Sequence, residues 1–194
     1  AGERLGHGTA LFTNPREWYA KRRQLHKRRQ DHLIDLFWAR ALLAQGDRHD
    51  GLERDPQLSR LAGDLIEDRF GQVVAKNCRD QKSHYLDLNK WPSEAALYQE
   101  LDPGQKPDRL IMVEIDESYI ALVEALRARV IQRVWRREVV LEACPTSNML
   151  ISGLASYGDL PYLNLNRSGF ADERSLKHPI LMTLNTDNPG NLNT

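Results

Sequence analysis

The spacing of strand-like segments constrains this chain more than any other feature. One such segment lies within residues 1–13, and two more lie within residues 138–194. Residues 14–137, between them, are mostly helical in pattern. Strands that alternate with single helices build βα units, but the stretch between the first and second strands here is several times longer than one helix requires. The pattern therefore predicts an α/β fold that carries a long, mostly helical insertion.

Apolar residues recur at helical spacing in several parts of this insertion. One long helix is expected over residues 15–45, with Asn14 as its N-cap and Gly46 as its stop. Three further helices are expected at residues 56–70, 92–101 and 117–137. The last of them leads directly into a strand at residues 139–141, so it is the candidate for a helix of the main α/β fold. Residues 110–115 fit either a strand or the start of a helix.

Composition excludes several classes of protein. A chain with 41% hydrophobic and 28% charged residues is of the ordinary globular kind. Its formal net charge of zero gives no overall field that favours nucleic acid or a membrane. No apolar run approaches the roughly 18 residues of a membrane span, and no signal-peptide pattern is present. The two cysteines, Cys78 and Cys144, form neither a disulfide framework nor a CxxC metal site, so a cytoplasmic protein is expected.

Three motifs stand at the ends of strand-like segments. They are RLGHG at residues 4–8, LEACPTSN at residues 141–148 and LNTDNP at residues 184–189. In this order they resemble the motifs that end successive strands in the zinc-dependent adenosine/AMP deaminase superfamily. The resemblance covers the two ends of the chain, residues 1–13 and 138–194.

The resemblance implies the C-terminal part of a (β/α)8 TIM barrel. Residues 1–13 would be barrel strand 6 and its loop, and residues 138–194 would be strands 7 and 8 with their active-site loops. Residues 14–137 would be the helical insertion together with one barrel helix. A complete barrel takes about 250 residues. We therefore expect this chain of 194 residues to be a piece of a larger protein.

The resemblance also implies a zinc site. Asp187 would be the strand-8 carboxylate that binds zinc and orients the attacking water, and His7 would stabilise that water or act as its general base. Each residue also has a simpler interpretation. Asp187 could cap local backbone in a turn before Pro189, and His7 could be a hydrogen-bonded histidine in a turn flanked by glycines.

Asn188 departs from the family, which usually has a second aspartate at this position, in contact with the purine ring. An acceptor nitrogen on the base needs a donor, and an amide supplies N–H donors at any pH. Asn188 could therefore keep the contact with the substrate. The same change is equally compatible with altered specificity or lost activity.

For other residues near the motifs, the sequence gives weaker evidence of a role in the site. Cys144 in the CPTSN segment would shape the wall of the pocket, and His178 before Pro179 fits either the family pattern or an ordinary loop. In the family, the general acid and the histidine that matches His7 end separate strands. Glu3 lies too close to His7 to be that acid. The six histidines form no His-x-His pair, although the family has one on strand 1. The remaining zinc ligands and the general acid are therefore expected outside this chain.

The stretch from Arg16 to Arg29 is strongly basic and contains Trp18 and Tyr19. Such a segment can bind RNA or nucleotide phosphates, but a solvated helix face or a subunit contact is the favoured interpretation. If it binds phosphates, ATP becomes a better substrate candidate than bare adenosine.

The expected function is zinc-dependent deamination of adenosine or an adenine nucleotide, with release of ammonia. The long insertion is similar to that of the large bacterial deaminase-like proteins, which include the deaminase subunit of the RADAR anti-phage system. This resemblance implies a homo-oligomer, an AAA+ ATPase partner and a role in anti-phage defence. Two alternatives remain open: a catalytically impaired scaffold subunit, favoured by Asn188, and an RNA-binding module built on the basic stretch.

Overall fold

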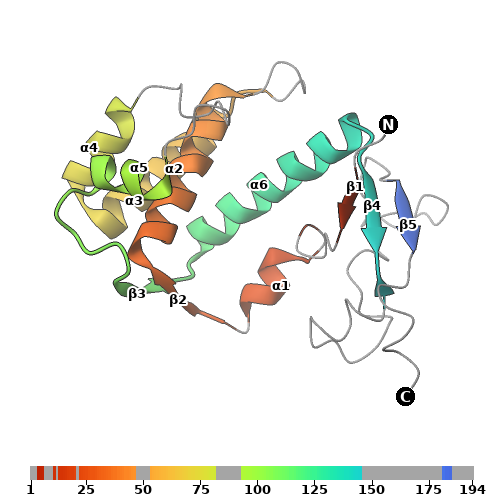
Figure 1. Cartoon of the computed structure of the whole chain (residues 1–194), viewed down its shortest axis with the longest axis horizontal. Helices are drawn as coiled ribbons and strands as arrows, with labels where there is room; N and C mark the ends of the chain where they lie inside the picture. The colour runs from red at the N-terminus through yellow and green to blue at the C-terminus, as the bar shows by residue number, and fades with distance from the viewer. Residues whose placement is uncertain are drawn as a thin grey trace. The chain divides into compact units, whose positions relative to one another are not determined.

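The computed structural model describes residues 4–6, 11, 13–20, 22–46, 53–81, 93–145 and 181–184. Its helices and strands follow one another along the chain as Figure 1 shows. They are β1 (Arg4–Gly6), α1 (Pro15–Ala20), β2 (Gln24–Arg28), α2 (Arg29–Gln45), α3 (Pro56–Phe70), α4 (Gln72–Asp80), α5 (Glu94–Leu101), β3 (Leu110–Glu114), α6 (Glu117–Arg136), β4 (Val140–Ala143) and β5 (Met182–Leu184). The chain forms two compact units, one of residues 1–14 and 127–194 and one of residues 15–126.

The first unit contains a three-stranded parallel sheet in the order β1-β4-β5. Gly6 pairs with Glu142, and Glu142 pairs in turn with Thr183. The C-terminal half of α6 covers one face of the sheet, where Ile131 and Val134 form a small core with apolar side chains of β4. Parallel strands with a helix on the face are the elements of a βα architecture.

The second unit is a helical cluster that carries a two-stranded ribbon. Its core is made by α2, α3, α4 and α5, with fully buried side chains such as Leu33, Ile66 and Tyr98. Strands β2 and β3 pair antiparallel, with Gln24 opposite Glu114 and Arg28 opposite Leu110. The ribbon packs Val113 inward and leaves Leu110 exposed.

The expected single helix over residues 15–45 is wrong. The structure has α1, then strand β2, then α2 in its place. Alternate residues of β2 are exposed and half-buried, which is the period of a strand rather than of a helix. Its partner β3 lies far along the chain, so the pairing that decides the conformation is not visible in the local pattern. The uncertain segment at residues 110–115 is accordingly a strand.

The helices predicted at residues 56–70, 92–101 and 117–137 are confirmed. Capping residues explain where two of them begin. Asp55 accepts a hydrogen bond from the Leu58 N–H at the start of α3, and Ser93 accepts one from the Ala96 N–H at the start of α5. Gly46 ends α2, as its sequence position predicted. Helix α4 forms from a segment whose sequence pattern is mixed. In the parts of the chain that the structure describes, no helix combines the length and the apolar character that crossing a membrane requires.

Gly71 joins α3 to α4 with a positive φ of 89°. Residues with a side chain rarely adopt this backbone conformation, so Gly71→Ala is expected to lower the free energy of unfolding by about 1 kcal/mol. The cost comes from the backbone alone, because no atom lies within 4 Å of the added methyl group. The matched control is Gly63→Ala inside α3, where the new Cβ makes an ordinary contact with Arg40. That control should be neutral or stabilising by up to about 1 kcal/mol. Urea unfolding of both variants measures the difference, and equal effects would contradict the argument.

Candidate active site

The carboxyl edge of the β1-β4-β5 sheet is where the three sequence motifs leave the sheet. The strands are parallel and adjacent, so their carboxyl ends lie at the same edge. Gly6 ends β1, Ala143 ends β4, and Leu184 ends β5. In folds built on parallel sheets this is the edge that carries ligands and catalytic side chains.

The predicted site residues themselves lie outside the part of the chain that the structure describes. His7 follows the last residue of β1 directly, and Asp187 and Asn188 come shortly after the last residue of β5. Glu3 and His178 also lie outside the described residues. The structure therefore describes the strands that lead into these residues, and the chemistry assigned to them stays a prediction.

Cys144 was expected to shape the wall of the pocket, and the structure describes its side chain. It is free of disulfides and buried, with 4% of its surface exposed, directly after β4. Burial of this kind suits a packing role in the wall of a site better than that of an accessible nucleophile.

The two faces of the sheet carry different side chains. Successive residues of a strand point to opposite faces. Leu141 and Ala143 are buried in the core that Ile131 and Val134 of α6 build. Glu142, between them in the sequence, therefore belongs to the face opposite that core. Sequence reasoning missed Glu142, although a lone carboxylate between apolar strand residues is a signal for a polar second face.

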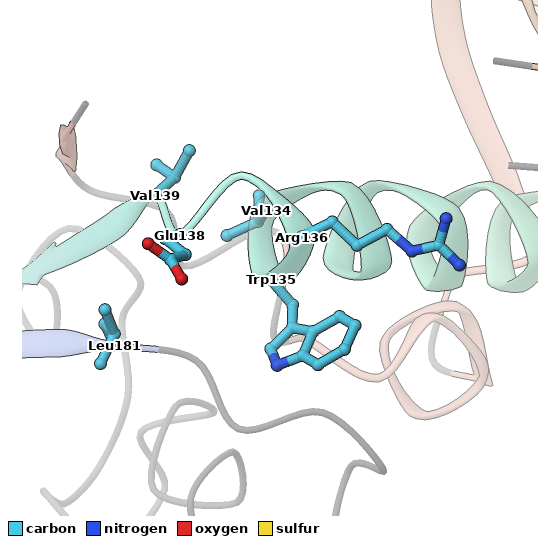
Figure 2. A pocket seen from close by; sticks show the side chains of 6 residues that line it. All are labelled: Val134, Trp135, Arg136, Glu138, Val139 and Leu181. Carbon is cyan, nitrogen blue, oxygen red and sulfur yellow. The ribbon is translucent and has the colours of Figure 1, made fainter. Parts of the chain in front are cut away.

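A pocket of about 440 Å³ lies at the other edge of the same sheet (Figure 2). Its lining includes Val139, directly before β4, and Leu181, directly before β5. The rest of the lining comes from the end of α6 and the turn after it, namely Val134, Trp135, Arg136 and Glu138. This is the amino edge, so the pocket is separate from the carboxyl edge where the motifs leave the sheet. Its single carboxylate gives no acid–base pair.

His32 is a fully buried titratable group of the second unit, and its surroundings do not suit a general base. Its side chain is fully buried, and its Nε2 atom lies 2.9 Å from a guanidinium nitrogen of Arg69. Because arginine can only donate, Nε2 accepts and the proton resides on Nδ1, which has no hydrogen-bond partner within the described part of the chain. Burial, helped by Arg69 and Lys27, lowers the pKa of His32 to about 3. The imidazole is therefore neutral and inaccessible.

The lowered pKa of His32 predicts a loss of stability in mild acid. The imidazole titrates near 6.5 in an unfolded chain, so the unfolded chain takes up the proton first. Stability is complete above pH 6.5 and falls as the pH drops toward 3, by about 2 kcal/mol at pH 5. Urea unfolding at pH 7 and pH 5 measures this loss. It should shrink by about that amount in His32→Gln and persist in His26→Gln, an exposed control on β2. An equal loss in His32→Gln and the wild type would contradict the assignment.

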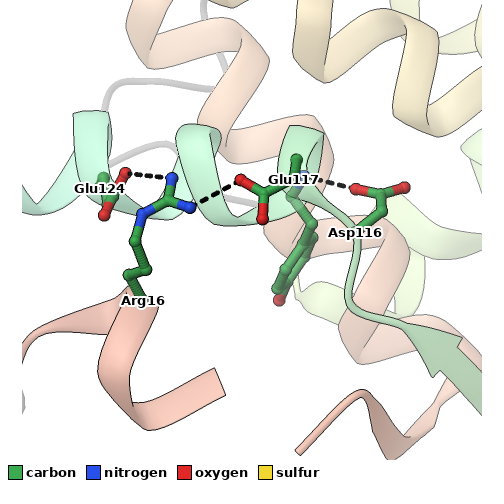
Figure 3. A network of polar contacts seen from close by, with 5 residues as sticks. Arg16, Asp116, Glu117 and Glu124 are labelled. Atoms are coloured by element: carbon green, nitrogen blue, oxygen red, sulfur yellow. Dashed lines mark hydrogen bonds and ion pairs between the residues drawn. The ribbon is translucent and has the colours of Figure 1, made fainter. Parts of the chain in front are cut away.

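Most of the basic stretch is neutralised inside the second unit. Arg16 pairs with Glu117 at 2.7 Å and with Glu124 at 3.4 Å on α6, as Figure 3 shows. Lys27 pairs with Asp35. Arg28 pairs with Asp31, Arg29 pairs with Asp102, and Arg22 lies over the ring of Trp18 at 4.5 Å. Cations engaged in this way present less field to a polyanion than their number suggests, which favours the structural interpretation of this stretch.

Among the residues that the structure describes, no group of three or more His, Cys, Asp or Glu side chains is placed to hold a metal ion. The prediction of zinc therefore depends on His7 and Asp187 and on the motifs that contain them. Comparison with protein-family models and with curated proteins finds no significant match for the chain.

Proposed function

We propose that this chain is the C-terminal part of a zinc-dependent hydrolytic deaminase that acts on adenosine or an adenine nucleotide. The observation that carries the proposal is the order of the sheet. The three strands from which the motifs RLGHG, LEACPTSN and LNTDNP continue are adjacent and parallel, in the order β1-β4-β5. The motifs thus leave the sheet at one edge, as a shared catalytic site requires. A TIM barrel built from these strands, with residues 15–126 as its insertion, is part of the same proposal.

The reaction adds water to C6 of the purine and releases the 6-amino group as ammonia, so that adenosine becomes inosine. A bound zinc ion supplies a water molecule of lowered pKa. On this proposal Asp187 holds the metal and orients the water. His7 holds the proton of that water, and the Asn188 amide donates a hydrogen bond to a ring nitrogen. The general acid and the other zinc ligands are contributed by residues outside this chain.

The finer parts of the proposal concern substrate and partners. ATP is the preferred substrate if phosphates are bound, and a homo-oligomer with an AAA+ ATPase partner in the cytoplasm is the arrangement that the family resemblance favours. RNA binding is not part of the proposal, because ion pairs engage Arg16, Lys27, Arg28 and Arg29.

Ammonia release from adenosine and from ATP tests the function directly. The complete protein should release ammonia when loaded with zinc and lose that activity after treatment with a chelator. Recovery on re-addition of zinc would identify the metal as the source of the activity. A zinc-loaded protein that releases no ammonia from either substrate would overturn the proposal.

A catalytically impaired scaffold is the second candidate, and Asn188 is the observation that favours it. The two candidates differ in metal content, because a site without chemistry has no need to retain zinc. Zinc bound at one ion per chain together with ammonia release excludes the scaffold. Absence of both would support it.

A further inference from the structure

Glu138 follows helix α6 in a backbone conformation that glutamate seldom adopts. In the described part of the chain it is the only residue other than glycine with a positive φ, which is 50°. Helices α2 and α3 end on Gly46 and Gly71, with φ values of 65° and 89°. Glycine occupies this region freely, whereas a Cβ atom makes it costly. The glutamate side chain therefore stands here at a cost to stability, and such positions point to a function.

Two backbone hydrogen bonds hold the turn that contains Glu138. The Val139 N–H donates to the Val134 carbonyl oxygen at 3.1 Å, and the Glu138 N–H donates to that of Trp135 at 3.1 Å. These bonds satisfy carbonyl groups at the end of α6 and fix the path of the chain into β4. The direction in which the Glu138 side chain leaves the backbone is thus set by the fold.

The Glu138 side chain lines the pocket of about 440 Å³ at the amino edge of the sheet. Figure 2 shows its carboxylate on the same side of the turn as the Trp135 indole and Leu181, which line the same pocket. The Arg136 guanidinium extends along α6, away from this carboxylate. Within the residues that the structure describes, no ion pair or side-chain hydrogen bond engages Glu138. Its negative charge can therefore meet a ligand.

The rest of the lining decides which ligand suits this carboxylate. Trp135 and Leu181 supply apolar surface, and they are 38% and 58% exposed. A cation is attracted both by the face of an indole ring and by a carboxylate. The volume falls in the range of small-molecule sites, about 300 to 1,000 Å³. An anion would be repelled by Glu138, and a metal ion would leave the apolar walls without a partner.

We propose that this pocket binds a small organic ammonium ion, with its cationic group at Glu138 and its apolar part against Trp135. The site lies at the amino edge of the sheet, away from the edge where the sequence motifs leave it. Its binding is thus independent of the proposed deaminase chemistry and can be measured without it.

Benzylammonium is the probe, and benzyl alcohol is its neutral analogue of the same shape. In calorimetric titrations of the complete protein at pH 7, benzylammonium should bind about tenfold more tightly than benzyl alcohol. Glu138→Gln should weaken the binding of benzylammonium about tenfold, and Trp135→Leu should weaken it about fivefold. The matched control is Asp108→Asn, which changes a carboxylate that is 84% exposed in the second unit and should leave the affinity unchanged.

Glu138→Gly separates binding from folding. Glycine removes the carboxylate and relieves the cost of the positive φ, so the urea midpoint should rise while the affinity for benzylammonium falls as in Glu138→Gln. A loss of binding in a protein of raised stability cannot come from unfolding. Unchanged affinity in either Glu138 variant would overturn the proposal. Equal affinity of the wild type for both compounds, or binding of neither, would overturn it as well.

Discussion

Replacing Asp187 by alanine is expected to reduce ammonia release by about a thousandfold or more. A metal ion that polarises water stabilises the transition state by several kcal/mol, and each 1.4 kcal/mol is a factor of ten in rate. On the proposed function Asp187 is the only zinc ligand that this chain supplies. Its loss should therefore also lower the zinc content of the purified protein. Ammonia release and metal analysis of the complete protein, with adenosine as substrate, measure the two effects together.

Asp108→Ala is the matched control for this experiment. It removes a carboxylate of the second unit that is 84% exposed and lies 3.7 Å from Arg28. Exposed pairs of this kind contribute little to stability, so the variant should fold, bind zinc and release ammonia as the wild type does. An Asp187→Ala protein that retains zinc and activity would show that the aspartate only caps its local turn.

The second large effect is expected at the buried ion pair between Arg29 and Asp102. The guanidinium Nε atom donates to the carboxylate at 2.7 Å, and the pair is 14% and 6% exposed. The same carboxylate oxygen accepts a bond from the Tyr98 hydroxyl at 3.1 Å, and burial beside Asp102 raises the pKa of Tyr98, so that this hydroxyl stays protonated. Arg29→Met removes the cation and leaves a buried carboxylate with only a neutral donor. The free energy of unfolding should fall by about 3–5 kcal/mol.

Lys27→Met serves as the control, because it breaks an ion pair of similar length at a more solvent-exposed position. Its ammonium lies 2.6 Å from Asp35, but that carboxylate is 59% exposed. The expected cost is below about 1 kcal/mol. Urea unfolding of both variants at pH 7 gives the comparison. Costs of the same size would mean that burial does not decide the value of the Arg29 pair.

Helices α3, α5 and α6 follow from local sequence, because capping residues and periodicity act over a few positions. Helices were predicted to start at residues 56 and 92; α3 starts at Pro56 after the cap Asp55, and α5 starts at Glu94 after the cap Ser93. The β2–β3 ribbon does not follow from local sequence. Strand β2 forms by pairing with β3, and the two strands are separated in the chain by helices α2 to α5. The basic residues of that segment resemble one continuous helix until this partner is known.

Electrostatic pairing was equally invisible in the sequence. The charges of Arg16 and Arg29 looked available for an external anion, whereas their partners Glu117 and Asp102 come from distant parts of the chain. For the candidate site, the motifs at residues 4–8, 141–148 and 184–189 predicted residues that lie mostly outside the described structure. Glu142, by contrast, could be assigned to the face opposite the α6 core only once strand β4 was known.

The register between β1 and β4 also has a consequence for folding. Arg4 pairs with Val140, so the chain must close a loop across the whole second unit to form the sheet. Closing an unstructured loop of that length costs about 4 kcal/mol in chain entropy. Residues 15–126 form a compact unit, so they can fold first and fix the distance between their two ends. The parallel sheet is then expected to form late, and its formation should be the slower phase in a refolding experiment.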